Sequence, residues 1–278
     1  MRHSPDVVFI NGRFLTQPFT GVQRFAKEIV LAIDRLLAEC NEASQQFRLL
    51  MPRPAGWEMN LRRIVAQRVG LLNGHLWEQL VLPKAARGGP LLSLGNSGPV
   101  GHRAQFLTIH DAGVFANPRN FTRSFRIWYR WLHRRLGRSP ARLFTVSEFS
   151  KRELIRYCGL PAERIEVVYN GCDHMERCSV AEDLLRVHCI VPGRYVLCVG
   201  WKSPNKNFGL VVEAVRRIGA PELDIVAVGA SNRGVFRQTE KIDGVRIRDL
   251  GHVSDAASRR AGPAGSCRAP RARRTPSP

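Results

Sequence analysis

Short apolar segments rich in β-branched residues alternate along the chain with segments that have the periodicity of an amphipathic helix. The first helix is predicted from apolar residues at i, i+3, i+4 and i+7 spacing: Val22, Phe25, Ala26, Ile29, Ile33, Leu36 and Leu37. Thr20 and Gln23 form a capping box at its start. The same spacing predicts a second helix over residues 208–218.

The strand-like segments are bounded by turn-forming residues. They are Asp6–Asn11, Phe47–Met51, Leu91–Leu94, Phe106–His110, Leu143–Ser147, Ile165–Tyr169, Tyr195–Val199, Leu223–Val228 and Val245–Leu250. Because helices separate many of these strands, the pattern predicts an α/β fold in which parallel sheets are covered by helices on both faces.

A polar stretch after Asn170 and Gly171 precedes Pro192, Gly193 and a new strand, and it marks a domain boundary. We expect an N-terminal Rossmann-like domain over residues 1–175 and a shorter second one over residues 176–255. Residues 256–278 hold six Arg, six Ala and four Pro and no Leu, Ile, Val, aromatic or acidic residue. Such a segment is expected to be disordered, and it suggests a frame change or truncation after residue 255.

The formal net charge is +20, and six of these charges lie in the final 23 residues. This balance favours polyanionic partners, either nucleic acid, an anionic membrane or phosphate-bearing substrates. No apolar run approaches the roughly 18 residues of a spanning helix, and no signal segment precedes the first strand, so a cytoplasmic protein is expected. The seven cysteines lack any Cys-x-x-Cys pair, and Cys172–Cys178 holds only one His, which predicts reduced thiols and no metal site.

The segment Arg123–Arg142 carries arginines on one helical stripe and Phe125, Trp128, Leu132 and Leu136 on another. One interpretation is a helix that lies on an anionic bilayer surface. The other is an Arg-faced helix that packs its apolar stripe into the core of the first domain. The sequence leaves both open.

Several segments resemble glycosyltransferase family 4, also called glycosyltransferase group 1, in the order in which that family carries them. They are Phe19–Phe25, Thr108–Ala112, Thr145–Leu154, Tyr169–Gly171 and Val199–Asn207. Leu76–Leu80 with Leu82 and Pro83, and Asn96–Pro99, resemble the mannosyltransferase-like enzymes of bacterial surface polysaccharide assembly. The resemblance implies a GT-B fold of two Rossmann-like domains and retaining transfer, without a metal or other cofactor, from a nucleotide diphosphate sugar such as GDP-mannose to a glycan or lipid-linked acceptor.

The resemblance also assigns roles to individual residues. His110 and Asp111 follow a strand at the carboxyl edge of the first sheet and would lie beside the donor sugar, although Asp111 can also cap the next turn. Gly21 at a helix N-terminus and Lys206 before a helix would contact the diphosphate. Ser147 and Glu148 would assist in donor binding, although Ser147 is equally explained as a helix N-cap. The family's later glycine loop and Glu-x7-Glu helix have no counterpart after Asp255.

Two other hypotheses compete with an active glycosyltransferase. A chain without those later donor contacts would be an inactive remnant of such an enzyme. The high positive charge alone favours a nucleic-acid-binding protein, but the sequence carries no recognised binding module and its basic residues are spread over Rossmann-like segments, so no specific nucleic acid is expected.

Overall fold

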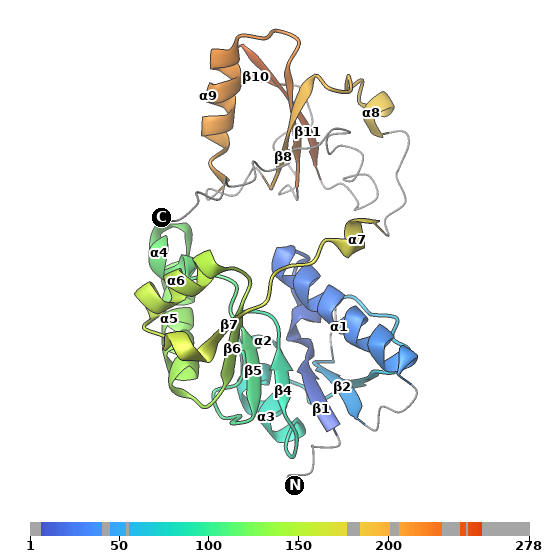
Figure 1. The fold of residues 1–278 in the computed structure, drawn as a ribbon, viewed down its shortest axis with the longest axis vertical. Coiled ribbons are helices and arrows are strands. Elements are labelled where there is room, and N and C mark those ends of the chain that lie inside the picture. The colour runs from blue at the N-terminus through green and yellow to red at the C-terminus, as the bar shows by residue number, and fades with distance from the viewer. Residues whose placement is uncertain are drawn as a thin grey trace, which may run out of the picture. The chain divides into compact units, whose positions relative to one another are not determined.

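The computed structural model describes residues 7–40, 45–53, 56–176, 184–200, 206–229, 240–242 and 244–251 (Figure 1). Contacts divide the chain into two compact units, with the boundary between Asn170 and Gly171. This boundary falls five residues before the one that we placed at 175. The proposed tail, residues 256–278, and the frame change or truncation suggested after residue 255 lie outside the described residues.

A parallel sheet of seven strands forms the centre of the first unit, in the order β3-β2-β1-β4-β5-β6-β7. The strands are β1 (Val7–Asn11), β2 (Gln46–Met51), β3 (Val65–Arg68), β4 (Leu91–Ser93), β5 (Gln105–Thr108), β6 (Arg142–Thr145) and β7 (Ile165–Val167). The chain moves outward from β1 in one direction through β2 and β3, then returns to the other side of β1 with β4. The carboxyl ends of β1 and β4 therefore form a topological switch point, where open α/β sheets bind their ligands.

Helical segments follow most of these strands. They are η1 (Gly12–Thr16), α1 (Gly21–Glu39), α2 (Gly74–Leu76), the π-helical turn η2 (Trp77–Val81), α3 (Leu82–Ala85), α4 (Gly113–Ala116), η3 (Pro118–Asn120), α5 (Arg123–Arg138), α6 (Glu148–Cys158) and η4 (Ala162–Arg164). The capping box of α1 is present, since the Gln23 side chain accepts from the Thr20 backbone N–H at 3.2 Å.

Strand alternation distributes the core over the two faces of this sheet. On one face, Phe9 and Leu91 pack with Trp77 and Leu82 of the η2–α3 segment. On the same face, the strand residues Leu107 and Leu143 pack with Leu132 and Leu136 of α5 and Leu154 of α6. On the opposite face, Ile10 and Leu49 pack with Ala26 and Val30 of α1.

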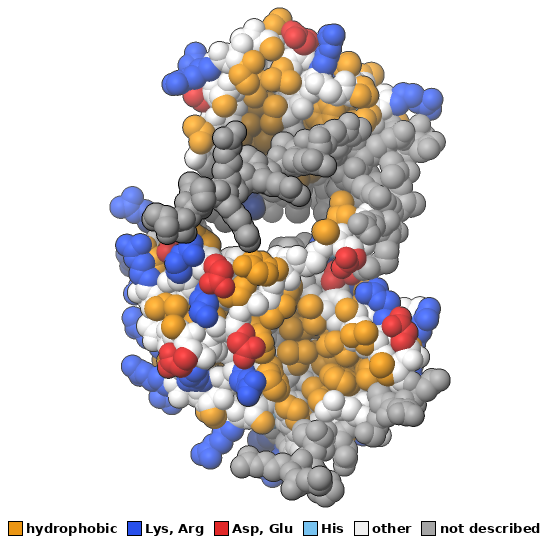
Figure 2. Space-filling model, in the orientation of Figure 1, with side chains coloured by type: hydrophobic (Ala, Val, Ile, Leu, Met, Phe, Trp, Pro, Cys, Tyr) orange, Lys and Arg blue, Asp and Glu red, His pale blue; other side chains and the backbone are white. Residues whose placement is uncertain are grey.

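The α1 side of the sheet is covered unevenly. Phe106 and Phe144 stack there with ring centroids 6.2 Å apart and stay half-buried. Figure 2 shows hydrophobic side chains gathered beside α1 on this side of the first unit. The prediction of full helical cover on both faces is thus not met by the described helices.

The second unit contains a four-stranded sheet in the order β10-β11-β9-β8. Its elements are α7 (Asp173–Glu176), α8 (Leu184–Val187), β8 (Tyr195–Val199), α9 (Phe208–Ile218), β9 (Asp224–Val228), β10 (Glu240–Ile242) and β11 (Val245–Gly251). Val212 and Val215 of α9 pack on Ile225 of β9 and Ile247 of β11, which gives the unit a core of its own.

The prediction of an α/β fold with parallel sheets is confirmed, with two corrections in detail. Strand β3 escaped the sequence analysis because its four residues are all exposed and show no apolar pattern. Strand β10 pairs antiparallel with β11, so the second sheet is mixed rather than wholly parallel.

Candidate functional site

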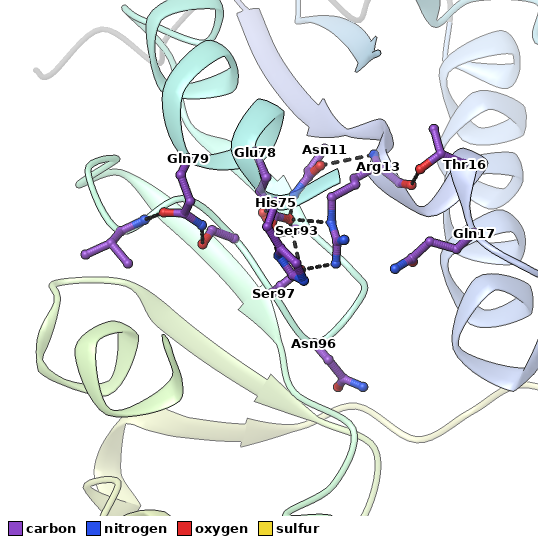
Figure 3. Close-up of polar contacts among 12 residues, drawn as sticks. Asn11, Arg13, Thr16, Gln17, His75, Glu78, Gln79, Ser93, Asn96 and Ser97 are labelled. Carbon is purple, nitrogen blue, oxygen red and sulfur yellow. Dashed lines mark hydrogen bonds and ion pairs between the residues drawn. The ribbon is translucent and has the colours of Figure 1, made fainter. Parts of the chain in front are cut away.

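A cluster of buried polar side chains lies at the switch point of the first unit (Figure 3). Glu78 Oε1 accepts hydrogen bonds from Arg13 Nε at 3.1 Å, Asn11 Nδ2 at 2.9 Å and the Ser97 hydroxyl at 2.9 Å. Arg13 also donates from a terminal nitrogen to Ser97 Oγ at 2.8 Å. The Glu78 carboxylate thus accepts hydrogen bonds from the end of β1, from η1 and from the loop after β4.

Strand alternation explains why these residues meet. Asn11 lies two residues after Phe9, and Ser93 two residues after Leu91, so both point to the face that η2 covers. Glu78 lies in the π-helical turn of η2, where the Leu82 N–H donates to the Trp77 carbonyl five residues back. Such single π-turns within helices are frequent at functional sites.

The charges of this cluster are balanced. Burial by itself would raise the pKa of Glu78, but the Arg13 guanidinium and hydrogen bonds from His75 and Asn11 hold that pKa below its usual value. His75 lies at the partly exposed end of the cluster, with Nδ1 3.3 Å from Glu78 Oε2. The carboxylate therefore stays charged beside the guanidinium, and the net charge of the pair is zero.

His110 lies just beyond β5, at the same edge of the sheet. Its Nε2 is 3.0 Å from the Leu94 carbonyl, and because a carbonyl only accepts, Nε2 carries the proton and Nδ1 the lone pair. The ring also makes an edge contact with Phe25, with centroids 4.8 Å apart. Burial lowers the pKa of His110, although the Leu94 carbonyl and Asp111 act in the opposite direction. The imidazole is therefore neutral near pH 7 and can accept a hydrogen bond from a hydroxyl.

Asp111 and Ser147 make capping contacts, and the donor roles predicted for them, for Glu148 and for Gly21 stay predictions. Asp111 is exposed, and its Oδ1 accepts from the Gly113 N–H at 2.7 Å, as a turn cap does. Ser147 is the N-cap of α6 and accepts from the Ser150 N–H at 3.1 Å, while Glu148 is exposed in the first turn. Gly21 is the exposed first residue of α1, and a Cβ there would meet nothing within 4 Å. The space that a phosphate would need beside Gly21 is open.

Lys206 lies in the second unit, beside the end of β8. A Cβ added at Gly200 would lie 3.7 Å from Lys206 Cε, so the exposed lysine extends along the carboxyl edge of the second sheet. Its neighbours Trp201–Asn205 lie outside the described residues. The structure therefore places His110, Asp111, Gly21, Ser147 and Glu148 in one unit and Lys206 in the other.

Helix α5 contradicts part of the bilayer interpretation of Arg123–Arg142. Leu132 and Leu136, half of the apolar stripe expected on a membrane, have no exposed surface and lie in the core. The large apolar side chains exposed on this helix are Phe125, which belongs to that stripe, and Ile127 and Trp131, which do not. The core interpretation accounts for the leucines because the helix must cover Leu107 and Leu143 of the sheet.

Within the described ranges, no three His, Cys, Asp or Glu side chains are grouped so as to hold a metal ion. Cys40, Cys158, Cys172, Cys189 and Cys198 are free thiols, and Cys178 of the weak metal-like segment lies outside the described residues. Burial raises the pKa of the Cys158 thiol to about 12, so this cysteine is inert at neutral pH. No described helix is both long and apolar enough to cross a membrane.

Comparisons with known proteins bear on the first unit. Residues 44–176 match the family described as Glycosyltransferase Family 4. Most of the first unit is thus similar to glycosyltransferase family 4. This confirms the resemblance drawn from the sequence motifs over the matched residues, which include η2, the loop after β4 and His110.

Two further proteins are similar to the chain. Over 112 residues it is 33% identical to the O-antigen chain mannosyltransferase B of Escherichia coli, a match that covers 38% of this chain and 29% of the relative. The crystal structure of WaaG, a glycosyltransferase involved in lipopolysaccharide biosynthesis, aligns with 80% of this chain and 63% of its own at 13% identity and a TM-score of 0.48. The chain thus matches less than two thirds of the length of either protein.

Sequence reasoning missed the roles of Arg13, Glu78 and Ser97. Glu78 and Ser97 lie in segments that were noted only for their family resemblance. A usable signal was present, since Asn11 and Ser93 are polar residues at the ends of otherwise apolar strands. A buried strand that ends on a polar residue needs a hydrogen-bond partner nearby.

Proposed function

We propose that the chain acts in the retaining transfer of a hexose, with mannose as the first choice, from a nucleoside diphosphate sugar to a glycan or lipid-linked acceptor of a cell-surface polysaccharide. GDP-mannose is the proposed donor, and no metal or other cofactor takes part. The family match over residues 44–176 and the mannosyltransferase named among the similar proteins support this proposal. They favour it over the nucleic-acid-binding hypothesis.

The observation that carries the proposal is the neutral His110 at the carboxyl edge of the first sheet. A departing nucleotide leaves positive charge at the anomeric carbon, so a protonated imidazole beside the sugar would oppose the reaction. His110 is held neutral by burial, and its Nε2–H is bound to Leu94. Its Nδ1 can then accept a sugar hydroxyl and fix the orientation of the ring that reacts.

The experiment is a transfer assay with the purified chain, GDP-mannose and a lipid-linked glycan acceptor, followed by analysis of the product and its anomeric configuration. We expect transfer with retention and a loss of about 100-fold or more in kcat/KM for His110→Ala, because the contact positions the reacting sugar. His102→Ala is the matched control, since the His102 ring is also buried but binds the Ala86 carbonyl. No transfer from a panel of nucleoside diphosphate sugars would contradict the proposal and favour the inactive remnant.

We further propose that the protein works at the cytoplasmic face of a membrane, loosely held through α5. Ile127 is 71% exposed and Trp131 is 44% exposed, and the exposed Arg134, Arg135 and Arg138 follow on the same helix. In Figure 2, Lys and Arg side chains line the side of the first unit that carries α5 in Figure 1. Apolar side chains beside arginines suit an anionic interface. In a sedimentation assay with anionic vesicles, the double variant Ile127→Ser with Trp131→Ser should bind more weakly than the wild-type chain. Equal binding would contradict this part of the proposal.

A further inference from the structure

The loop from Gly95 to Val100, which follows β4 at the switch point, is held in one shape by polar side chains. The Asn96 carbonyl accepts from His133 Nε2 at 2.9 Å, and its backbone N–H donates to the Thr108 carbonyl at 3.1 Å. Gln79 donates to the Gly98 carbonyl and accepts from the Val100 N–H, both at 3.0 Å. Asn96 itself has a φ of +63°, a left-handed conformation that Asn adopts more readily than most non-glycine residues.

The orientation of the Asn96 side chain in this loop is fixed by chemistry. The His110 backbone N–H lies 2.7 Å from one end of the amide, and since an N–H must meet an acceptor, that end is Oδ1. The other end is therefore the NH2 group. Figure 3 shows the side chain extending away from the Glu78 cluster, and within the described part of the chain Nδ2 has no hydrogen-bond partner.

A second amide at the same edge is oriented by a similar sequence of contacts. The Thr20 N–H donates to Gln23 Oε1, which makes the other end of Gln23 the NH2 group. That nitrogen donates to Gln17 Oε1 at 2.8 Å. The remaining end of Gln17 is thus also an NH2 group, and it too has no partner among the described residues.

The two amides come from the loops that follow β1 and β4, the strands of the switch point. Gln17 lines a small hollow together with Gly95, Ser97 and the buried Arg13–Glu78 pair. Figure 3 shows the Gln17 amide reaching from the β1 side toward that pair. Because Arg13 and Glu78 neutralise each other, the Gln17 amide is an uncharged donor beside a charge-balanced pair.

We propose that Gln17 Nε2 and Asn96 Nδ2 donate hydrogen bonds to hydroxyl oxygens of a bound sugar and so help to determine which sugar the site accepts. Oriented neutral amide donors at this edge, of which Gln17 lies beside the charge-balanced Arg13–Glu78 pair, suit hydroxyl groups better than phosphate, which calls for cations or helix N-termini. The inference rests on the proposed function, in which this edge belongs to a glycosyltransferase. It goes beyond that function because it names two specificity-determining contacts.

The direct test follows the side-chain NH2 signals of the full chain by ¹⁵N NMR. Gln17→Glu and Asn96→Asp each keep the oxygen that accepts from Gln23 or His110 but lack the NH2 group, so the missing signals assign the two amides. We expect at least one of a panel of methyl hexopyranosides to shift both NH2 signals in the wild-type chain, and inorganic pyrophosphate to shift neither. No shift from any glycoside at about 100 mM, well above the Kd range of weak sugar sites, or a shift from pyrophosphate alone, would overturn the proposal.

Turnover provides the second readout. We expect Gln17→Ala to lower kcat/KM about 2- to 12-fold, as the loss of one neutral hydrogen bond does, with an unchanged melting temperature. Asn96→Asp is expected to lower it tenfold or more, whereas Asn120→Asp, which adds the same charge at an exposed position, leaves it unchanged. If the variants change the KM of only one substrate, donor or acceptor, the sugar that contacts Gln17 and Asn96 belongs to that substrate. Unaltered kinetics in both Gln17→Ala and Asn96→Asp would overturn the proposal.

Failure of this inference and failure of the proposed function give different results. NH2 shifts with glycosides but no transfer by the chain would contradict only the proposed function. Transfer without any NH2 shift would contradict only the roles of Gln17 and Asn96.

Discussion

Arg13 Nε lies 3.1 Å from Glu78 Oε1, and the exposed fractions of the two side chains are 7% and 0%. The pair joins η1 to η2 across the switch point of the sheet. Because both charges are out of water, each depends on the other, and the loss of one leaves an uncompensated charge in the core.

We therefore expect Glu78→Gln to destabilise the first unit by about 3–5 kcal/mol, measured by urea unfolding. The double variant Arg13→Met with Glu78→Leu should lose less than the sum of its single changes, with a coupling of about 1–3 kcal/mol. Glu58→Gln, in the exposed pair with Arg68, is the matched control and should cost less than about 1 kcal/mol. Additive single changes would show that the buried pair is not coupled.

Stability should depend on two buried histidines at mildly acidic pH. Burial lowers the pKa of His110 and of His133 in the folded state. The unfolded chain then binds protons first, so stability is complete above the unfolded value near 6.5 and is lost as the pH falls toward and through the lowered folded values. Urea unfolding at pH 7.5 and 5.5 should show this loss, and His133→Gln should reduce it. An equal loss in wild type and in His133→Gln would contradict a contribution from that residue.

Arg164 is expected to stabilise the end of α5. Its guanidinium donates to the carbonyls of Gly137, Ser139 and Ala141, with 2.7 Å to Gly137 and 2.6 Å to Ala141. Charged donors to carbonyls contribute about 1.5–3 kcal/mol each at most, and their effects overlap. We expect Arg164→Ala to lower the free energy of unfolding by about 2–4 kcal/mol in thermal or urea melts. Arg164→Lys should recover only part of this, because one ammonium cannot reach three carbonyls in the same way.

Asp34 connects helix α1 to the segment before β3 through hydrogen bonds. Its carboxylate accepts from the backbone N–H groups of Arg62, Arg63 and Ile64, each at 2.8 Å. Burial alone would raise the pKa of Asp34, but these donors and the Arg62 charge hold it below the usual 3.8. Stability is therefore complete above about pH 4 and is lost as the pH falls through the lowered folded value. Asp34→Asn should weaken this acid-induced loss and destabilise the protein at pH 7, and a variant as stable as wild type would contradict the argument.

Lys206 is expected to contribute to binding of the donor diphosphate. Loss of a charge-assisted contact should reduce transition-state stabilisation by about 2–4 kcal/mol, seen as a lower kcat/KM for Lys206→Ala. Lys84→Ala, which removes an exposed lysine of α3 in the first unit, serves as the control for the loss of one positive charge. Equal kinetics for Lys206→Ala and wild type would remove this residue from the donor site.

The sequence by itself located most of the elements. Strand β8 and helix α9 have the predicted bounds, and β1 and α1 differ by little, because alternation and helical periodicity are local properties of the chain. The order of the motifs also indicated the family resemblance. By contrast, β3 carries no apolar pattern and becomes a strand only because its backbone pairs with β2.

The site depended on tertiary structure. Arg13 and Glu78 are 65 residues apart, and nothing in either segment specifies the other as its partner. Only the strand order, which places β4 beside β1, brings Glu78, Asn11 and Ser97 to one point. The direction of the Asn96 amide was decided in the same way, because the His110 N–H that fixes it comes from the segment just after the neighbouring strand β5. Local pattern determines which residues are buried, whereas the packing of strands and helices determines which buried groups meet.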